Sequence, residues 1–94
     1  MARHPLREAA RNRQCMVRIP GVCNHNPETT VLAHRPSGKL AVKADDADAC
    51  WACYDCHKWL DEEWVRHVTK SERDTVFERA VWDTQLILHK EGLM

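Results

Sequence analysis

The clearest periodic pattern of the chain lies near its C-terminal end. Side chains suited to a core recur there at the three- and four-residue spacing of one helix face: Val76, Phe77, Ala80, Val81, Thr84, Ile87 and Leu88. Thr69 and Ser71 each precede an acidic residue by three positions, as in a capping box, and Gly92 supplies a stop signal. The sequence therefore predicts a helix over about 71–91 that contributes to the core.

Shorter patterns fill the first two thirds of the chain. A helix is predicted at residues 5–13, where proline at the start is followed by a small apolar face. Strands are predicted at 15–19 and 28–35, on either side of a Pro-Gly turn. A further helix is expected to follow the cysteine-rich stretch and to end near residue 66. Four tryptophans are expected in the core: Trp51, Trp59, Trp64 and Trp82.

Length and composition indicate a small soluble protein. The 94 residues suggest one domain, with its central part at about 11–66, and so short a chain often needs a metal to support a modest core. No apolar run approaches the roughly 20 residues of a membrane span. Because the N-terminus lacks the apolar centre of a signal peptide, we expect a cytoplasmic location.

Five cysteines in a reducing compartment are better interpreted as metal ligands than as disulfides. Cys15 and Cys23 lie on either side of the Pro-Gly turn, and Cys53 and Cys56 have the spacing of a zinc-binding pair. Cys50 offers a competing pair with Cys53. We favour Cys53 and Cys56 because that choice leaves a histidine free in the first turn of the following helix. A structural zinc bound by these four thiolates is therefore expected.

A second site is predicted from histidines and carboxylates. His57 and Asp61 would share one helix face, where an imidazole and a carboxylate can hold a divalent ion such as Mg²⁺. His34, at the end of a predicted strand, could deprotonate an attacking water molecule. Asp46 or Asp48 could add a further ligand from the charged loop at 37–49.

Positive charge is unevenly distributed, although the net charge is zero. The arginines of the first 20 residues form either a solvated helix surface or an arm that contacts phosphates. The clustered arginines are Arg3, Arg7, Arg11, Arg13 and Arg18. Four other basic side chains are candidate contacts to nucleic-acid phosphates: Arg35, Lys39, Lys43 and Lys58.

Two segments, CMVRIPGVCNHNPETTVLAHR and ACYDCHKWLD, together resemble the HNH (ββα-metal) nuclease family, and more narrowly the YbcO-like proteins of lambdoid phages and prophages. The resemblance implies an α+β fold with a small zinc-stabilised ββα-metal core, an N-terminal helix and a long C-terminal helix. It implies that His34 is the general base, that His57 and Asp61 are metal ligands, and that the four cysteines hold zinc.

The expected function is a metal-dependent DNA endonuclease that works in phage recombination or DNA processing inside a bacterial host. DNA is the expected partner, and a homodimer or a recombination-protein partner would fit this role. The alternative is a zinc-stabilised module that binds nucleic acid or protein without catalysis. Ala33 favours that alternative, because many HNH nucleases have a metal ligand at this position. A nucleophilic enzyme using Cys50 with His25 or His67 has no supporting spacing.

Overall fold

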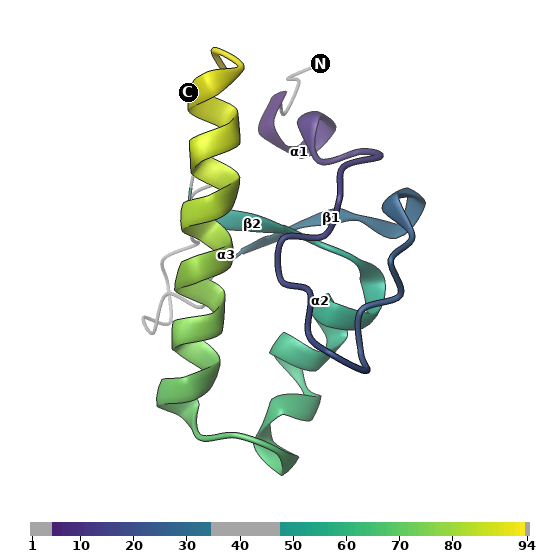
Figure 1. Cartoon of the computed structure of the whole chain (residues 1–94), viewed down its shortest axis with the longest axis vertical. Helices are drawn as coiled ribbons and strands as arrows, with labels where there is room; N and C mark the ends of the chain where they lie inside the picture. The colour runs from purple at the N-terminus through teal and green to yellow at the C-terminus, as the bar shows by residue number, and fades with distance from the viewer. Residues whose placement is uncertain (1–4, 35–47, 94) are drawn as a thin grey trace, which may run out of the picture.

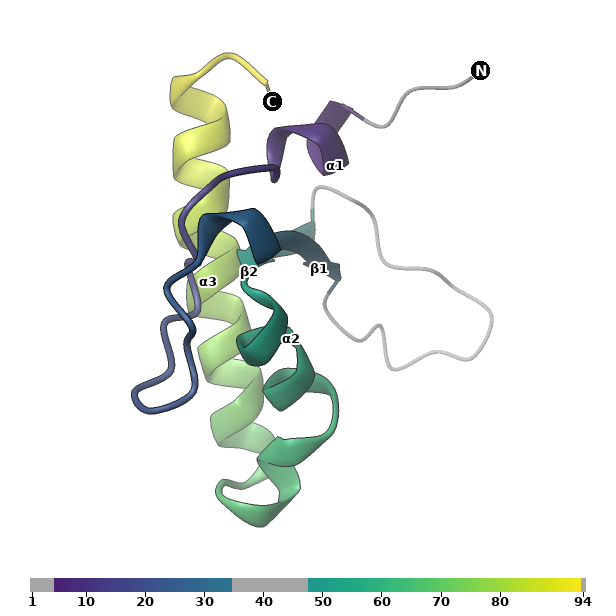
Figure 2. The same ribbon diagram turned by 90° about the vertical axis from the view of Figure 1, so that its right-hand side faces the viewer.

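A two-stranded antiparallel sheet and a long C-terminal helix organise the fold. The structure is a computed structural model that describes residues 5–34 and 48–93. In chain order the elements are α1 (Pro5–Ala9), η1 (Pro27–Thr29), β1 (Val31–His34), β2 (Ala49–Ala52), α2 (Tyr54–Asp61), η3 (Glu63–Arg66) and α3 (Lys70–Lys90). In both views α1, the sheet and α2 are stacked in that order alongside α3 (Figure 1, Figure 2). The expected α+β class and long C-terminal helix are confirmed.

Helix α3 forms as its sequence pattern predicts. The Thr69 hydroxyl accepts a hydrogen bond from the Glu72 backbone N–H, and the Glu72 carboxylate accepts one from the Thr69 N–H. At the other end Gly92 adopts a φ of 75°, and the N–H of Leu93 donates to the carbonyl of Leu88. The predicted stripe contributes five buried side chains: Phe77, Ala80, Val81, Thr84 and Leu88.

One tryptophan of the four is on the surface. Trp82 is 63% exposed, so its expected place in the core is wrong. It follows buried Val81, and one residue of a helix rotates the side chain by about 100° away from the core stripe. Trp51 and Trp59 are buried as expected, whereas Trp64 is half-buried.

The strand at 15–19 is not formed, so that prediction is wrong. The chain there curls around Cys15, whose sulfur accepts a hydrogen bond from the N–H of Arg18 at 3.5 Å. Arg18 has a φ of 51°, which is incompatible with a strand. A further turn follows, in which the carbonyl of Ile19 accepts from the N–H of Cys23 at 2.9 Å. These turns replace the expected ladder and aim both cysteines inward.

The observed sheet instead pairs β1 with β2, and Leu32 lies opposite Trp51 in its register. Every residue of β2 is buried, so the segment has no alternation of polar and apolar positions that could have revealed a strand. The strand predicted at 28–35 is shortened because η1 precedes it. The helix predicted at 5–13 ends at Ala9, and the helix expected to reach residue 66 divides into α2 and η3.

Two hydrogen bonds occupy the outer edge of β2. The carbonyl of Trp51 accepts from the N–H of Met16 at 2.8 Å, and the N–H of Trp51 donates to the hydroxyl of Thr84 at 3.1 Å. The Thr84 hydroxyl in turn donates to the carbonyl of Ala80 at 2.8 Å. Thr84 therefore joins α3 to the sheet inside the core. None of the helices in the described ranges has the length and apolar character needed to cross a membrane.

Replacing Thr84 by valine should reduce the free energy of unfolding by about 1–3 kcal/mol, because the buried N–H of Trp51 then lacks an acceptor. Chemical denaturation of the metal-loaded protein would measure the change. Thr84→Ser, which keeps the hydroxyl, is the matched control, and its free energy of unfolding should fall by less. Equal stability of the valine and serine variants would contradict this role.

Candidate functional site

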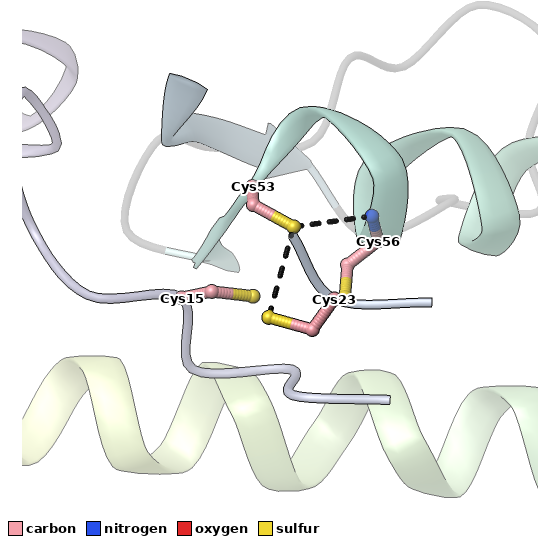
Figure 3. A group of neighbouring side chains, drawn as sticks. All are labelled: Cys15, Cys23, Cys53 and Cys56. Carbon is pink, nitrogen blue, oxygen red and sulfur yellow. Dashed lines mark hydrogen bonds between the residues drawn. The ribbon is translucent and has the colours of Figure 1, made fainter. Parts of the chain in front are cut away.

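Four cysteine sulfurs converge between the N-terminal loop and the start of α2 (Figure 3). The sulfurs of Cys15, Cys23, Cys53 and Cys56 all lie within 4.8 Å of one another, and those of Cys23 and Cys53 are 3.9 Å apart. Four sulfurs placed about 2.3 Å from a tetrahedral zinc ion would be about 3.8 Å apart. The group therefore fits a structural zinc ion, and its members are the four cysteines that the sequence predicts.

The sulfurs are positioned by local backbone structure on both sides. Cys53 is the N-cap of α2, and its sulfur accepts a hydrogen bond from the N–H of Cys56 at 3.3 Å. The two-residue spacing thus places Cys56 in the first turn of the helix. On the opposite side the turns around Cys15 carry the other two sulfurs. The Asn24 side chain also donates to the carboxylate of Asp55 at 2.9 Å, which ties the loop to α2.

Hydrogen bonding and burial shift the pKa values of Cys15, Cys23 and Cys56 in different directions. The pKa of Cys15 is lowered to about 4, first by the hydrogen bond with the Cys56 thiol and then by backbone N–H donors such as that of Arg18. The same hydrogen bond, together with burial, raises the pKa of Cys56, and burial raises the pKa of Cys23. The lowered pKa of Cys15 favours its thiolate form, and binding of a metal would displace the protons that remain on the other thiols.

The fifth cysteine is outside this group. Cys50 lies in the middle of β2, opposite Ala33, and is fully buried. Burial raises the pKa of its thiol to about 12, so the thiol stays protonated and unreactive. The two histidines considered as its partners lie elsewhere: His25 is 3.8 Å from the Cys23 sulfur, and the His67 ring stacks on Trp59.

His57 and Asp61 meet on α2 as their spacing predicts. The Nε2 atom of His57 is 3.3 Å from a carboxylate oxygen of Asp61, and both side chains are partly exposed. They line a shallow hollow of about 220 Å³ together with Tyr54, Lys58 and Glu62. An imidazole and a carboxylate that reach solvent side by side are suitable ligands for a divalent cation. Lys58, a predicted phosphate contact, is 3.9 Å from Glu63.

His34 occupies the last position of β1, where it pairs in register with Ala49. It lines a hollow with residues of the N-terminal segment, whereas His57 lines the hollow on α2. Asp48 immediately precedes Ala49 and so lies near the His34 end of the sheet. The remaining predicted site residues lie outside the described ranges: Arg35, Lys39, Lys43 and Asp46.

Two of the N-terminal arginines, for which the sequence left open either a solvated surface or an arm that contacts phosphates, lie beside His34. Arg7 and Arg11 line the same hollow as His34, although the chain separates them from it by more than 20 residues. Their four-residue spacing was the available signal, because it places both side chains on one side of a helical segment. The pattern of the N-terminal segment does not show which strand lies beside these two arginines, so their position near His34 could not be predicted from it.

Purified protein should contain zinc in equimolar amount, and Cys53→Ser should lose both the zinc and most of the thermal stability. Cys50→Ala should retain the zinc, because Cys50 is outside the cluster. Elemental analysis and thermal unfolding of the three proteins would check this. Retention of zinc by Cys53→Ser, or loss of zinc from Cys50→Ala, would contradict the assignment.

Comparisons with known proteins identify the family of this chain. A family model described as "Putative nuclease YbcO" matches residues 4–93. Two relatives, "Putative nuclease YbcO" of Escherichia coli K12 and "Putative nuclease ybcO" of Enterobacteria phage 82, are each 44% identical over 92 residues, covering 95% of both chains. A solved structure described as a putative bacteriophage protein from Escherichia coli K-12 covers 94% of this chain and 100% of its own, with a TM-score of 0.77 and 41% identity. The chain therefore belongs to the YbcO family.

Proposed function

We propose that this protein is a metal-dependent DNA endonuclease that acts as a single domain. The observation that carries the proposal is the solvent-facing pair of His57 and Asp61, 3.3 Å apart, on a helix whose first turn is fixed by the cysteine cluster. The names of the relatives support the reaction class, since both are described as putative nucleases. The order β1, β2, α2 is also the order of elements in the HNH core.

In the proposed site His57 and Asp61 would hold a divalent cation of the Mg²⁺ type, with Asp46 as a further ligand. Such an ion supplies charge stabilisation for the phosphate that is attacked. His34 would accept the proton of the attacking water as its oxygen bonds to phosphorus and the P–O bond of the leaving group breaks. Lys58, with Arg35, Lys39 and Lys43, would hold phosphates of the bound strand.

The cysteine cluster has a separate task in this proposal. Four sulfur ligands close the coordination shell of zinc and leave no position for water or substrate. The zinc would therefore stabilise the fold and position α2, while the chemistry takes place at a second ion. A homodimer would let two such sites cut opposite strands, and this remains a prediction.

One observation favours the second candidate, a non-catalytic module that binds nucleic acid or a recombination protein. Ala33, the residue before His34, is fully buried opposite Cys50. That position cannot supply a metal ligand, so the proposed metal site has fewer protein ligands than many HNH nucleases. The two candidate functions differ in catalysis. Both require binding of a partner, but only the nuclease would cleave DNA.

Incubation with supercoiled plasmid and Mg²⁺ or Mn²⁺ should give nicked and linear products, and His34→Ala should abolish them by removing the general base. His89→Ala changes an exposed histidine of α3 and should cut like the wild type. Gel electrophoresis over time would measure the rates. Absence of cutting with either metal, or equal cutting by His34→Ala, would favour the binding module.

Removal of a carboxylate ligand should weaken the second ion without affecting the zinc. In Asp61→Asn, the Mg²⁺ concentration for half-maximal cutting should rise by more than about tenfold, because loss of even an outer partner of a metal ligand has an effect of that size. Asp83→Asn, on α3, is the control. An unchanged Mg²⁺ requirement in Asp61→Asn, at unchanged zinc content, would exclude Asp61 as a ligand.

A further inference from the structure

A hollow of about 430 Å³ lies between the N-terminal segment and β1. Its described lining contains two arginines and a histidine. The lining residues are Arg7, Arg11, Thr30, Val31, Leu32 and His34. The hollow therefore brings cationic side chains to the strand end that carries the proposed general base.

The packing of the N-terminal segment directs these arginines outward. Ala10 is buried against Leu32 and Trp51, so the small apolar side of the segment faces the core. Arg7 and Arg11 are both exposed on the other side, four residues apart. Arg11 forms no ion pair with any residue in the described ranges.

Other arginines are used to hold the fold together. Arg13 forms a two-pronged ion pair with Glu91, and its guanidinium lies 4.8 Å from the Trp51 ring centroid. Arg73 donates to the carbonyl of Leu60 at 3.1 Å from a buried position.

Thr30 and Val31 give the lining of the hollow a polar and an apolar residue next to each other. Thr30 is only 5% exposed, and its hydroxyl makes no hydrogen bond within the part of the chain that the structure describes. The oxygen itself is buried, so it adds no contact to a ligand in the hollow. Val31 is 43% exposed and offers an apolar surface beside it. Arginine side chains commonly contact the phosphate oxygens and sugars of DNA.

We infer that this hollow binds a deoxyribose-phosphate of duplex DNA, with Arg7 and Arg11 as the phosphate contacts that position the strand for His34. The part played by His34 rests on the proposed function, whereas the binding of DNA does not. Contacts of this kind are independent of sequence and depend strongly on salt, because each bound phosphate releases condensed counterions.

The test compares Arg7→Gln/Arg11→Gln with Arg79→Gln/Lys90→Gln, which removes the same charge from exposed positions on α3. Fluorescence anisotropy with a short fluorescein-labelled DNA duplex, without added Mg²⁺, gives affinity over a series of salt concentrations. The arginine variant should bind more than about tenfold more weakly at low salt, and its slope of log affinity against log salt should be shallower by about 2. The control should match the wild type. Zinc content and circular dichroism check that all variants are folded.

The inference would be overturned if both double variants lost the same DNA affinity or if the salt slope of the arginine variant were unchanged. It would also be overturned if the wild type did not bind DNA. A plasmid cleavage assay tests the proposed nuclease activity separately from the binding of DNA in the hollow. Arginine-dependent binding without cutting would support the DNA site and refute the nuclease. If the wild type cuts, the arginine variant should show a raised KM with a smaller change in kcat, and cutting with unchanged KM would overturn the DNA site alone.

Discussion

The convergence of four sulfurs is the constraint on which the structure depends. It joins segments about 30 residues apart in the chain, a loop without regular structure and the first turn of α2. A chain of this length buries a limited apolar core, so the free energy of binding a metal can supply a large part of its folding free energy. The hydrogen bonds from Met16 to Trp51 and from Asn24 to Asp55 support the same junction.

This junction also determines where the polar side chains of the candidate site lie. One residue separates the end of β2 from the start of α2, so the sheet and the helix are closely coupled. His57 follows Cys56 directly and shares its helical turn, while His34 is held by its register with Ala49. The two histidines therefore depend on the same rigid unit, although each lines its own hollow.

Predictions from the sequence were accurate where the signal comes from residues that are close together in the chain. The caps and stripe of α3 follow from side chains within a few residues of each other, and the choice of Cys53 and Cys56 over Cys50 followed from the helix start. Prediction failed where distant contacts decide. Strand β2 is buried on all sides and has no alternating pattern, and a sulfur-centred turn replaces the strand expected at 15–19. Helix α1 ends at Ala9, before the chain turns at Asn12, which has a φ of 59°.

Cys53 has two roles at once, since its sulfur belongs to the cluster and also caps the helix that carries His57 and Asp61. Binding of a metal ion by the cluster would consequently be coupled to the order of that helix end. Zinc scarcity, or oxidation of a thiol, would loosen α2 at its beginning and disperse the imidazole–carboxylate pair without touching either group. The availability of zinc would in this way determine the order of a surface that does not contact the ion.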